Sequence, residues 1–173
     1  MSVLNILCFS DESFARELGK KTDDRDVESY IYKEQRGDIQ DALTFLRPRK
    51  HPEKMRPLLG SLDIADAAII EIKKVDASIG EVLVASSVAG IERGLVVINP
   101  EEGGWVDPDQ VKTILDQAGL KSWIPFYIKT LNNNELRSDI YQHKKSDLFS
   151  TQVSTNLWIV NGYTDKIYEQ ILE

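Results

Sequence analysis

The chain has little cysteine and no long apolar stretch. Its one cysteine among 173 residues, Cys8, excludes a disulfide within the chain. Cys8 lies in an apolar run, which predicts a buried, inert thiol, because a reactive thiolate needs an exposed, electropositive setting. The apolar runs fall well short of the roughly 20 residues that cross a bilayer. Since the first residues also lack the pattern of a secretory signal, we expect a cytoplasmic protein without membrane contact.

Positive charge is also scarce. The 21 lysines and arginines are outnumbered by 28 acidic residues, which gives a net charge of -7 and a pI of about 5.0. Such a molecule repels polyanions, so we expect no DNA binding, and any RNA contact would need a local basic patch. The two histidines and one cysteine lie far apart and form no metal-ligand spacing. We therefore expect no metal site.

The first third of the chain predicts the opening of an α/β domain. A chain of this length with 42% hydrophobic residues can bury roughly 70% of its unfolded surface in one core. Residues 4–9 predict a strand, and Ser10 can cap a helix over residues 11–21. Residues 27–33 and 42–46 predict an antiparallel strand pair.

Helices and strands alternate along the rest of the chain, with glycines placed at helix ends. We predict helices at residues 55–62, 79–89, 107–118 and 132–141, and strands at residues 67–72, 95–98 and 123–128. This alternation predicts a three-layer α/β fold, in which a mainly parallel sheet carries helices on both faces.

We predict an α/β domain over residues 1–150 and a C-terminal extension over residues 151–173. Residues 157–160 predict one more strand, and residues 164–172 predict a capped amphipathic helix. We favour packing of this extension on the same domain. The alternative is that it forms the opening strands of a second domain.

Three local runs resemble the Tu-type translational GTPases. Residues 62–72 (LDIADAAIIEI) are similar to the family's strand after the second switch. Residues 76–81 (DASIGE) and 90–99 (GIERGLVVIN) are similar to the stretch that leads to its guanine-binding loop. The resemblance covers residues 4–143 and is closest to archaeal paralogues of the selenocysteine-specific elongation factor. It implies a P-loop GTPase-like fold with an early antiparallel strand pair.

The phosphate-binding loop of that family is missing. Its pattern, GxxxxGK followed by serine or threonine, lets backbone N–H groups surround the phosphates while the lysine and the hydroxyl serve phosphate and Mg²⁺. The corresponding turn, residues 8–13, has no glycine and no lysine, and Ser10 is its vestige. Asp11 and Glu12 stand at the helix start, where each like-charge contact with a triphosphate costs on the order of a kcal/mol.

The Mg²⁺-binding DxxG motif is replaced as well. With Asp66 as the anchor, the motif falls on residues 47–50, so that Arg47 puts a positive charge where the second shell of a metal would lie. His51 then falls on the histidine that positions the attacking water in true elongation factors. This makes His51 a weak catalytic candidate, and an ordinary surface histidine is the favoured interpretation.

The guanine-binding NKxD motif is only partly kept. Asn99 is present, but proline follows it, and Glu102 is a longer substitute for the aspartate. An asparagine that ends a strand before a turn is the favoured interpretation. Because three nucleotide motifs are degenerate, we expect neither a cofactor nor GTPase activity.

One local basic cluster, the switch-like segment, is a candidate contact for a protein or for a ribosome- or tRNA-related partner. The alternative, which the net charge favours, is a solvated loop that balances the acidic surface. Its cationic residues are Arg47, Arg49, Lys50, Lys54 and Arg56.

The motifs leave three functional hypotheses. The first is a non-catalytic pseudo-GTPase-like domain that binds a macromolecule. The second is an elongation factor paralogue that binds GTP or GDP with Mg²⁺ through an atypical phosphate loop. The third is a small-molecule enzyme with its site at the carboxyl ends of the strands, for which no set of residues indicates a reaction.

Overall fold

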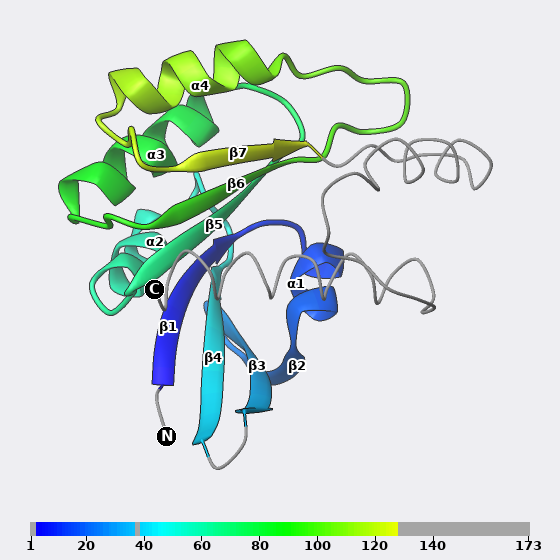
Figure 1. Cartoon of the computed structure of the whole chain (residues 1–173), viewed down its shortest axis with the longest axis vertical. Coiled ribbons are helices and arrows are strands. Elements are labelled where there is room, and N and C mark those ends of the chain that lie inside the picture. The colour runs from blue at the N-terminus through cyan, green and yellow to red at the C-terminus, as the bar shows by residue number, and fades with distance from the viewer. Residues whose placement is uncertain (1–2, 37–38, 128–173) are drawn as a thin grey trace.

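The structure is a computed structural model and describes residues 3–36 and 39–127 (Figure 1). Seven strands in these residues form one sheet with the order β2-β3-β4-β1-β5-β6-β7. The strands are β1 (Val3–Phe9), β2 (Lys20–Asp24), β3 (Val27–Arg36), β4 (Ile39–Pro48), β5 (Ala67–Ile72), β6 (Gly94–Ile98) and β7 (Ile124–Tyr127). The helices are α1 (Glu12–Leu18), α2 (Met55–Leu62), α3 (Ala77–Val88) and α4 (Pro108–Gln117).

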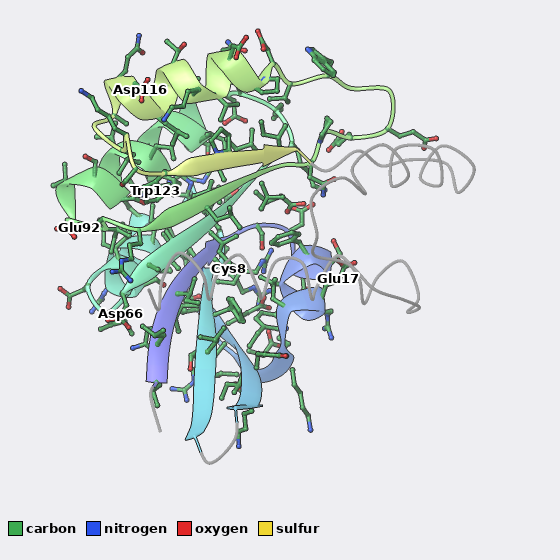
Figure 2. The ribbon with its side chains drawn as sticks, viewed as in Figure 1. Cys8, Glu17, Asp66, Glu92, Asp116 and Trp123 are labelled. Carbon is green, nitrogen blue, oxygen red and sulfur yellow. The ribbon has the colours of Figure 1, made fainter. Side chains whose placement is uncertain are left out.

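The sheet is mainly parallel with an antiparallel edge. β1 lies parallel between β4 and β5, and β6 and β7 continue the parallel part. β2, β3 and β4 pair antiparallel. At the start of β5, the Asp66 backbone N–H donates to the Asn5 carbonyl at 2.8 Å, and the Asp66 carboxylate accepts from the Asn5 N–H at 2.9 Å. This exchange fixes the start of β5 beside β1 (Figure 2).

Helices cover both faces of the sheet, which makes three layers (Figure 1). α1 buries Phe14 and Leu18 in a cluster with Tyr30 and Phe45 on one face. α2, α3 and α4 cover the other face, in a cluster that includes Trp123. Every residue of β5 and β6 is buried, as expected for parallel strands covered on both sides.

The predicted α/β architecture is confirmed. The helix over residues 55–62 and the strand over residues 67–72 have the predicted bounds, and the helices near residues 79–89 and 107–118 agree within two residues. Gly90 and Gly119, which end the two later helices, have φ angles of 76° and 83°, a conformation that favours glycine.

The predicted helix over residues 11–21 is wrong at its C-terminal end, residues 19–21. α1 ends at Leu18, and β2 begins at Lys20 and pairs with β3. Gly19 permits this, because a Cβ at Gly19 would lie 2.9 Å from the backbone of Ile31. Asp11, rather than Ser10, precedes the helix, and no side-chain hydrogen bond caps it.

The elements predicted at residues 132–141, 157–160 and 164–172 lie outside the described residues. The division into residues 1–150 and 151–173 therefore stays a prediction. In the described part of the chain, no helix is both long and apolar enough to cross a membrane.

Candidate functional site

A cleft of about 750 Å³ opens beside the carboxyl ends of β1, β4 and β5. We call it the carboxyl-end cleft. Ligands of parallel α/β sheets bind at this edge. Its lining comes from the turn after β1, the end of β4 and the loops after β5 and β6, and it includes Ser10, Asp11, Arg47, His51, Glu71 and Trp105.

A buried glutamate contacts two of the segments that the resemblance aligns with nucleotide-binding motifs. The Glu71 side chain lies in β5, and the residue is only 5% exposed. One carboxylate oxygen accepts the Asp11 backbone N–H at 2.9 Å, and the other accepts the Asn99 side-chain amide at 2.6 Å. Both donors are thus satisfied within the protein. They belong to the turn and the strand end where the resemblance places the phosphate and the guanine.

Sequence reasoning missed Glu71. The signal was present, because a glutamate interrupts an otherwise apolar run of six residues, AAIIEI. A buried carboxylate needs hydrogen-bond donors or a positive charge nearby. Its partners lie 60 and 28 residues away in sequence, so the pattern indicates that partners exist but does not identify them.

The two carboxylates at the start of α1 are neutralised by lysine and arginine side chains. Asp11 pairs with Lys73, and this hydrogen bond raises the pKa of Lys73. Glu12 pairs with Arg16 and Lys21, and the hydrogen bond from Arg16 is the main reason that the pKa of Glu12 is lowered. The acidic turn is thus compensated by lysine and arginine side chains of the protein.

Arg47 faces inward and forms part of a buried ion network. Its guanidinium donates to the Glu28 carboxylate at 2.7 Å and to the Ser10 carbonyl at 2.7 Å. Glu28 is 1% exposed and also accepts from Lys21 and Tyr30. Burial acts to raise the pKa of Glu28, but these hydrogen bonds outweigh it and lower the pKa to about 2.

Two of the other four cations of the switch-like segment have acidic neighbours. Arg49 pairs with Asp24 at 3.2 Å, and Lys54 lies 3.7 Å from Asp26. Lys50 and Arg56 are exposed and form no ion pair with other described residues. Arg47 thus differs from the outward cations Lys50 and Arg56: its guanidinium has partners inside the protein, whereas they are exposed at the surface.

The interpretation of His51 as an ordinary surface residue is wrong. Its side chain is 1% exposed, and its ring meets the Phe9 ring edge-on, with the centroids 5.4 Å apart. Nδ1 lies 3.0 Å from the Ser78 hydroxyl, whereas Nε2 forms no hydrogen bond and lies 3.5 Å from a Glu81 carboxylate oxygen. The imidazole packs between β1 and α3, which are distant in sequence, so the neighbouring residues gave no sign of its burial.

The last residue of the guanine-binding motif and an aromatic side chain at the rim of the cleft are exposed to solvent. Glu102 is exposed, and Trp105, at the rim of the cleft, is 72% exposed. The Ser10 hydroxyl lies 3.2 Å from the Cys8 sulfur. Cys8 is fully buried (Figure 2), which raises the pKa of its thiol to about 12, as expected for an inert cysteine. In the part of the chain that the structure describes, no group of three His, Cys, Asp or Glu side chains is arranged to hold a metal.

No family model matches the chain. An uncharacterised protein of Methanocaldococcus jannaschii is 32% identical over 112 residues, which are 65% of this chain and 34% of that protein. Translation elongation factor SelB of Methanococcus maripaludis, solved with the GTP analogue GPPNHP, matches with a TM-score of 0.58 at 20% identity, over 87% of this chain and 36% of that one. The chain thus spans about a third of the length of each. It shares the fold of part of an elongation factor.

Proposed function

We propose that the chain is a degenerate GTPase-like domain, related to translation elongation factors, that binds a macromolecule and does not hydrolyse GTP. The observation that carries this proposal is the Glu71 carboxylate, which accepts from Asp11 and Asn99. The structural likeness to an elongation factor supports the relation. Among the relatives of elongation factors, we propose that the chain belongs with archaeal paralogues whose nucleotide motifs are degenerate.

Two hydrogen bonds of Glu71 oppose the binding of a nucleotide. It uses the backbone donor of Asp11 at the turn where a phosphate-binding loop would present its N–H groups, and it holds the Asn99 amide away from a base. A phosphate entering this turn would also find the nearest lysine and arginine side chains already engaged, Lys73 with Asp11 and Arg16 with Glu12. Contacts within the protein thus use the hydrogen-bond donors that a bound nucleotide would otherwise engage.

Arg47 acts against Mg²⁺ at the same place. Its guanidinium is fixed by the Ser10 carbonyl and by Glu28, so a permanent positive charge lies beside the turn. A divalent cation would be repelled by it, and true phosphoryl transfer needs the metal to bridge the phosphates. His51 turns its ring toward Phe9 and Ser78, so in this proposal it supports packing and does not position water.

The proposed partner is a protein or a ribosome- or tRNA-related particle in the cytoplasm. The outward cations Lys50 and Arg56 of the switch-like segment would contribute to the contact, because they are exposed and lack acidic partners among the described residues. Arg47 would contribute indirectly, by holding the segment against the sheet.

A second candidate is an elongation factor paralogue that binds GTP or GDP with Mg²⁺ in an atypical way. The carboxyl-end cleft favours it, because about 750 Å³ lies within the range of small-molecule pockets. This candidate requires Glu71 to release Asp11 and Asn99 when the nucleotide enters.

A calorimetric titration with GTP and GDP, with and without Mg²⁺, separates the two candidates. An intact translational GTPase, titrated in parallel, shows that the nucleotides are active. We expect no heat and no rise in melting temperature at millimolar nucleotide, since only a ligand that binds the folded state stabilises it. Micromolar, Mg²⁺-dependent binding would overturn the proposal and make hydrolysis the next question.

A further inference from the structure

An apolar groove of about 720 Å³ runs between α2 and α3. We call it the α2–α3 groove. In α2, Met55 and Leu59 lie one turn apart and are 39% and 52% exposed. In α3, Val84 and Val88 also lie one turn apart and are 54% and 84% exposed. Side chains at this spacing share one helix face, so two apolar stripes border the groove.

The outer face of α3 departs from the usual pattern of a surface helix, which is polar toward solvent. Its inner face already buries Ile79, Val82 and Leu83. Gly80, one turn before Val84, lines the groove, and a Cβ at Gly80 would meet no atom within 4 Å. The glycine therefore leaves a notch at one end of the valine stripe. The exposed apolar side chains of this face would gain free energy if an occupant removed them from water.

The charged residues at the rim of the groove are both acidic. Asp63 from the end of α2 and Glu81 from α3 line it, and no basic residue does. The whole chain carries a net charge of -7. An occupant with an apolar stripe and flanking lysine or arginine would complement both the floor and the rim.

The dimensions favour a single helix as the occupant. α3 has 12 residues and α2 has 8, so the walls are about 18 and 12 Å long at 1.5 Å per residue. That length accommodates about three turns of a helix. A stable dimer usually needs roughly 20–30 residues on each side, which the groove does not offer. The chain's own C-terminal residues 164–173 have three acidic residues and one lysine, so their charge opposes the acidic rim.

We infer that the α2–α3 groove docks an amphipathic helix of another protein, with apolar side chains on one stripe and basic residues beside it. The inference rests on the proposed function, because it names the partner of a domain that works by binding. It also accounts for an exposed apolar surface that the carboxyl-end cleft does not use.

The experiment uses the full chain and defined peptide probes. A labelled peptide of about 15 residues made of leucine and lysine, with leucines at helical spacing, is titrated by fluorescence anisotropy. Its scrambled isomer keeps the charge but has no apolar stripe. A leucine–glutamate peptide of the same pattern keeps the stripe but reverses the charge. We expect the patterned basic peptide to bind at least about tenfold more tightly than either control.

Matched variants locate the binding on the protein. Val84→Asp and Val88→Asp should each weaken binding of the patterned basic peptide by about tenfold or more. Val3→Asp adds the same charge at a position that is 56% exposed and outside the groove, and it should leave binding within about twofold. All three positions are exposed, and circular dichroism confirms that each variant is folded.

Three outcomes would overturn the inference. One is equal binding of the patterned and scrambled peptides, which would indicate charge alone, and another is an equal loss in Val84→Asp and Val3→Asp. The third is a dimer by sedimentation that Val84→Asp dissociates, since the occupant would then be a second copy. Nucleotide binding in the calorimetric titration would instead contradict the proposed function, whatever the peptides show.

Discussion

The carboxyl-end cleft and the α2–α3 groove differ in how their surfaces are satisfied. In the cleft, Glu71, Arg47 and Asp11 all bind to partners within the chain. In the groove, Leu59, Val84 and Val88 are at least half exposed. The cleft lies at the sheet edge where parallel α/β folds bind ligands, yet it has internal partners for polar groups that a ligand would use.

This difference indicates which of the two surfaces would gain free energy by binding a partner. Buried polar groups that already have partners gain little from a ligand, because new hydrogen bonds only replace old ones. Exposed apolar surface gains from any occupant that removes it from water. We therefore expect a structural role for the contacts of Glu71, Arg47 and Asp11 in the cleft and a binding role for the groove, and four predictions test this difference.

The largest effect is expected for Arg47→Met, which removes the guanidinium between Glu28 and Ser10. Breaking a buried ion pair leaves an incompletely compensated charge, so the free energy of unfolding should fall by about 3 kcal/mol in urea denaturation. Arg56→Met is the matched control from the same segment and should change it by less than about 0.5 kcal/mol. Equal effects would mean that Arg47 is no more structural than its exposed neighbour.

Glu71→Ala should cost about 2 kcal/mol of stability, because the Asp11 N–H and the Asn99 amide lose their acceptor. Glu92→Ala removes an exposed glutamate and should be close to neutral. Thermal unfolding of both variants is the measurement. A neutral Glu71→Ala would show that water replaces the carboxylate without cost, and the cleft could then accept other ligands as easily.

The ion network of Glu28 should make stability depend on pH. Its folded pKa of about 2 lies below the ordinary value of 4.5, so the unfolded chain takes up the proton first as the pH falls. The stabilisation is complete above pH 4.5 and is lost as the pH falls toward 2. Over this interval the wild type should lose about 2 kcal/mol more than Glu28→Gln. Equal pH profiles from urea titrations would contradict the network.

The smallest effect on stability is expected in the groove. Val88→Ser should change the free energy of unfolding by less than about 0.5 kcal/mol, because Val88 is 84% exposed. Val82→Ser, on the buried face of the same helix, should cost about 2 kcal/mol or more. If both changes were equally destabilising, Val88 would have a packing role, and its surface would not be free for a partner.

Local signals in the sequence were enough to predict most of the described fold. α2 and β5 were predicted with their observed bounds, because proline, glycine and apolar spacing act within a few residues. The end of α1 could not be predicted in this way. Gly19 packs against the backbone of Ile31, and β2 forms because β3 offers it a partner, so both depend on contacts between separate segments.

The candidate site was less predictable than the fold, for the same reason. The differences from the nucleotide motifs at Ser10, Arg47 and Pro100 are visible in the sequence, but the contacts that these segments make are not. Glu71 reaches Asp11 across 60 residues, and His51 reaches Ser78 across 27. The α2–α3 groove was not predicted either, since exposure of Val84 depends on how two helices pack.

NMR of the isotope-labelled protein tests the central claim most directly, by following the Asp11 backbone amide and the Asn99 side-chain amide during addition of GTP and Mg²⁺. If Glu71 holds both donors, their signals stay unchanged at millimolar nucleotide, while those of Val84 and Val88 shift with the patterned basic peptide. Saturable shifts of the Asp11 and Asn99 signals with GTP would show that the cleft still binds nucleotide, and would contradict the account.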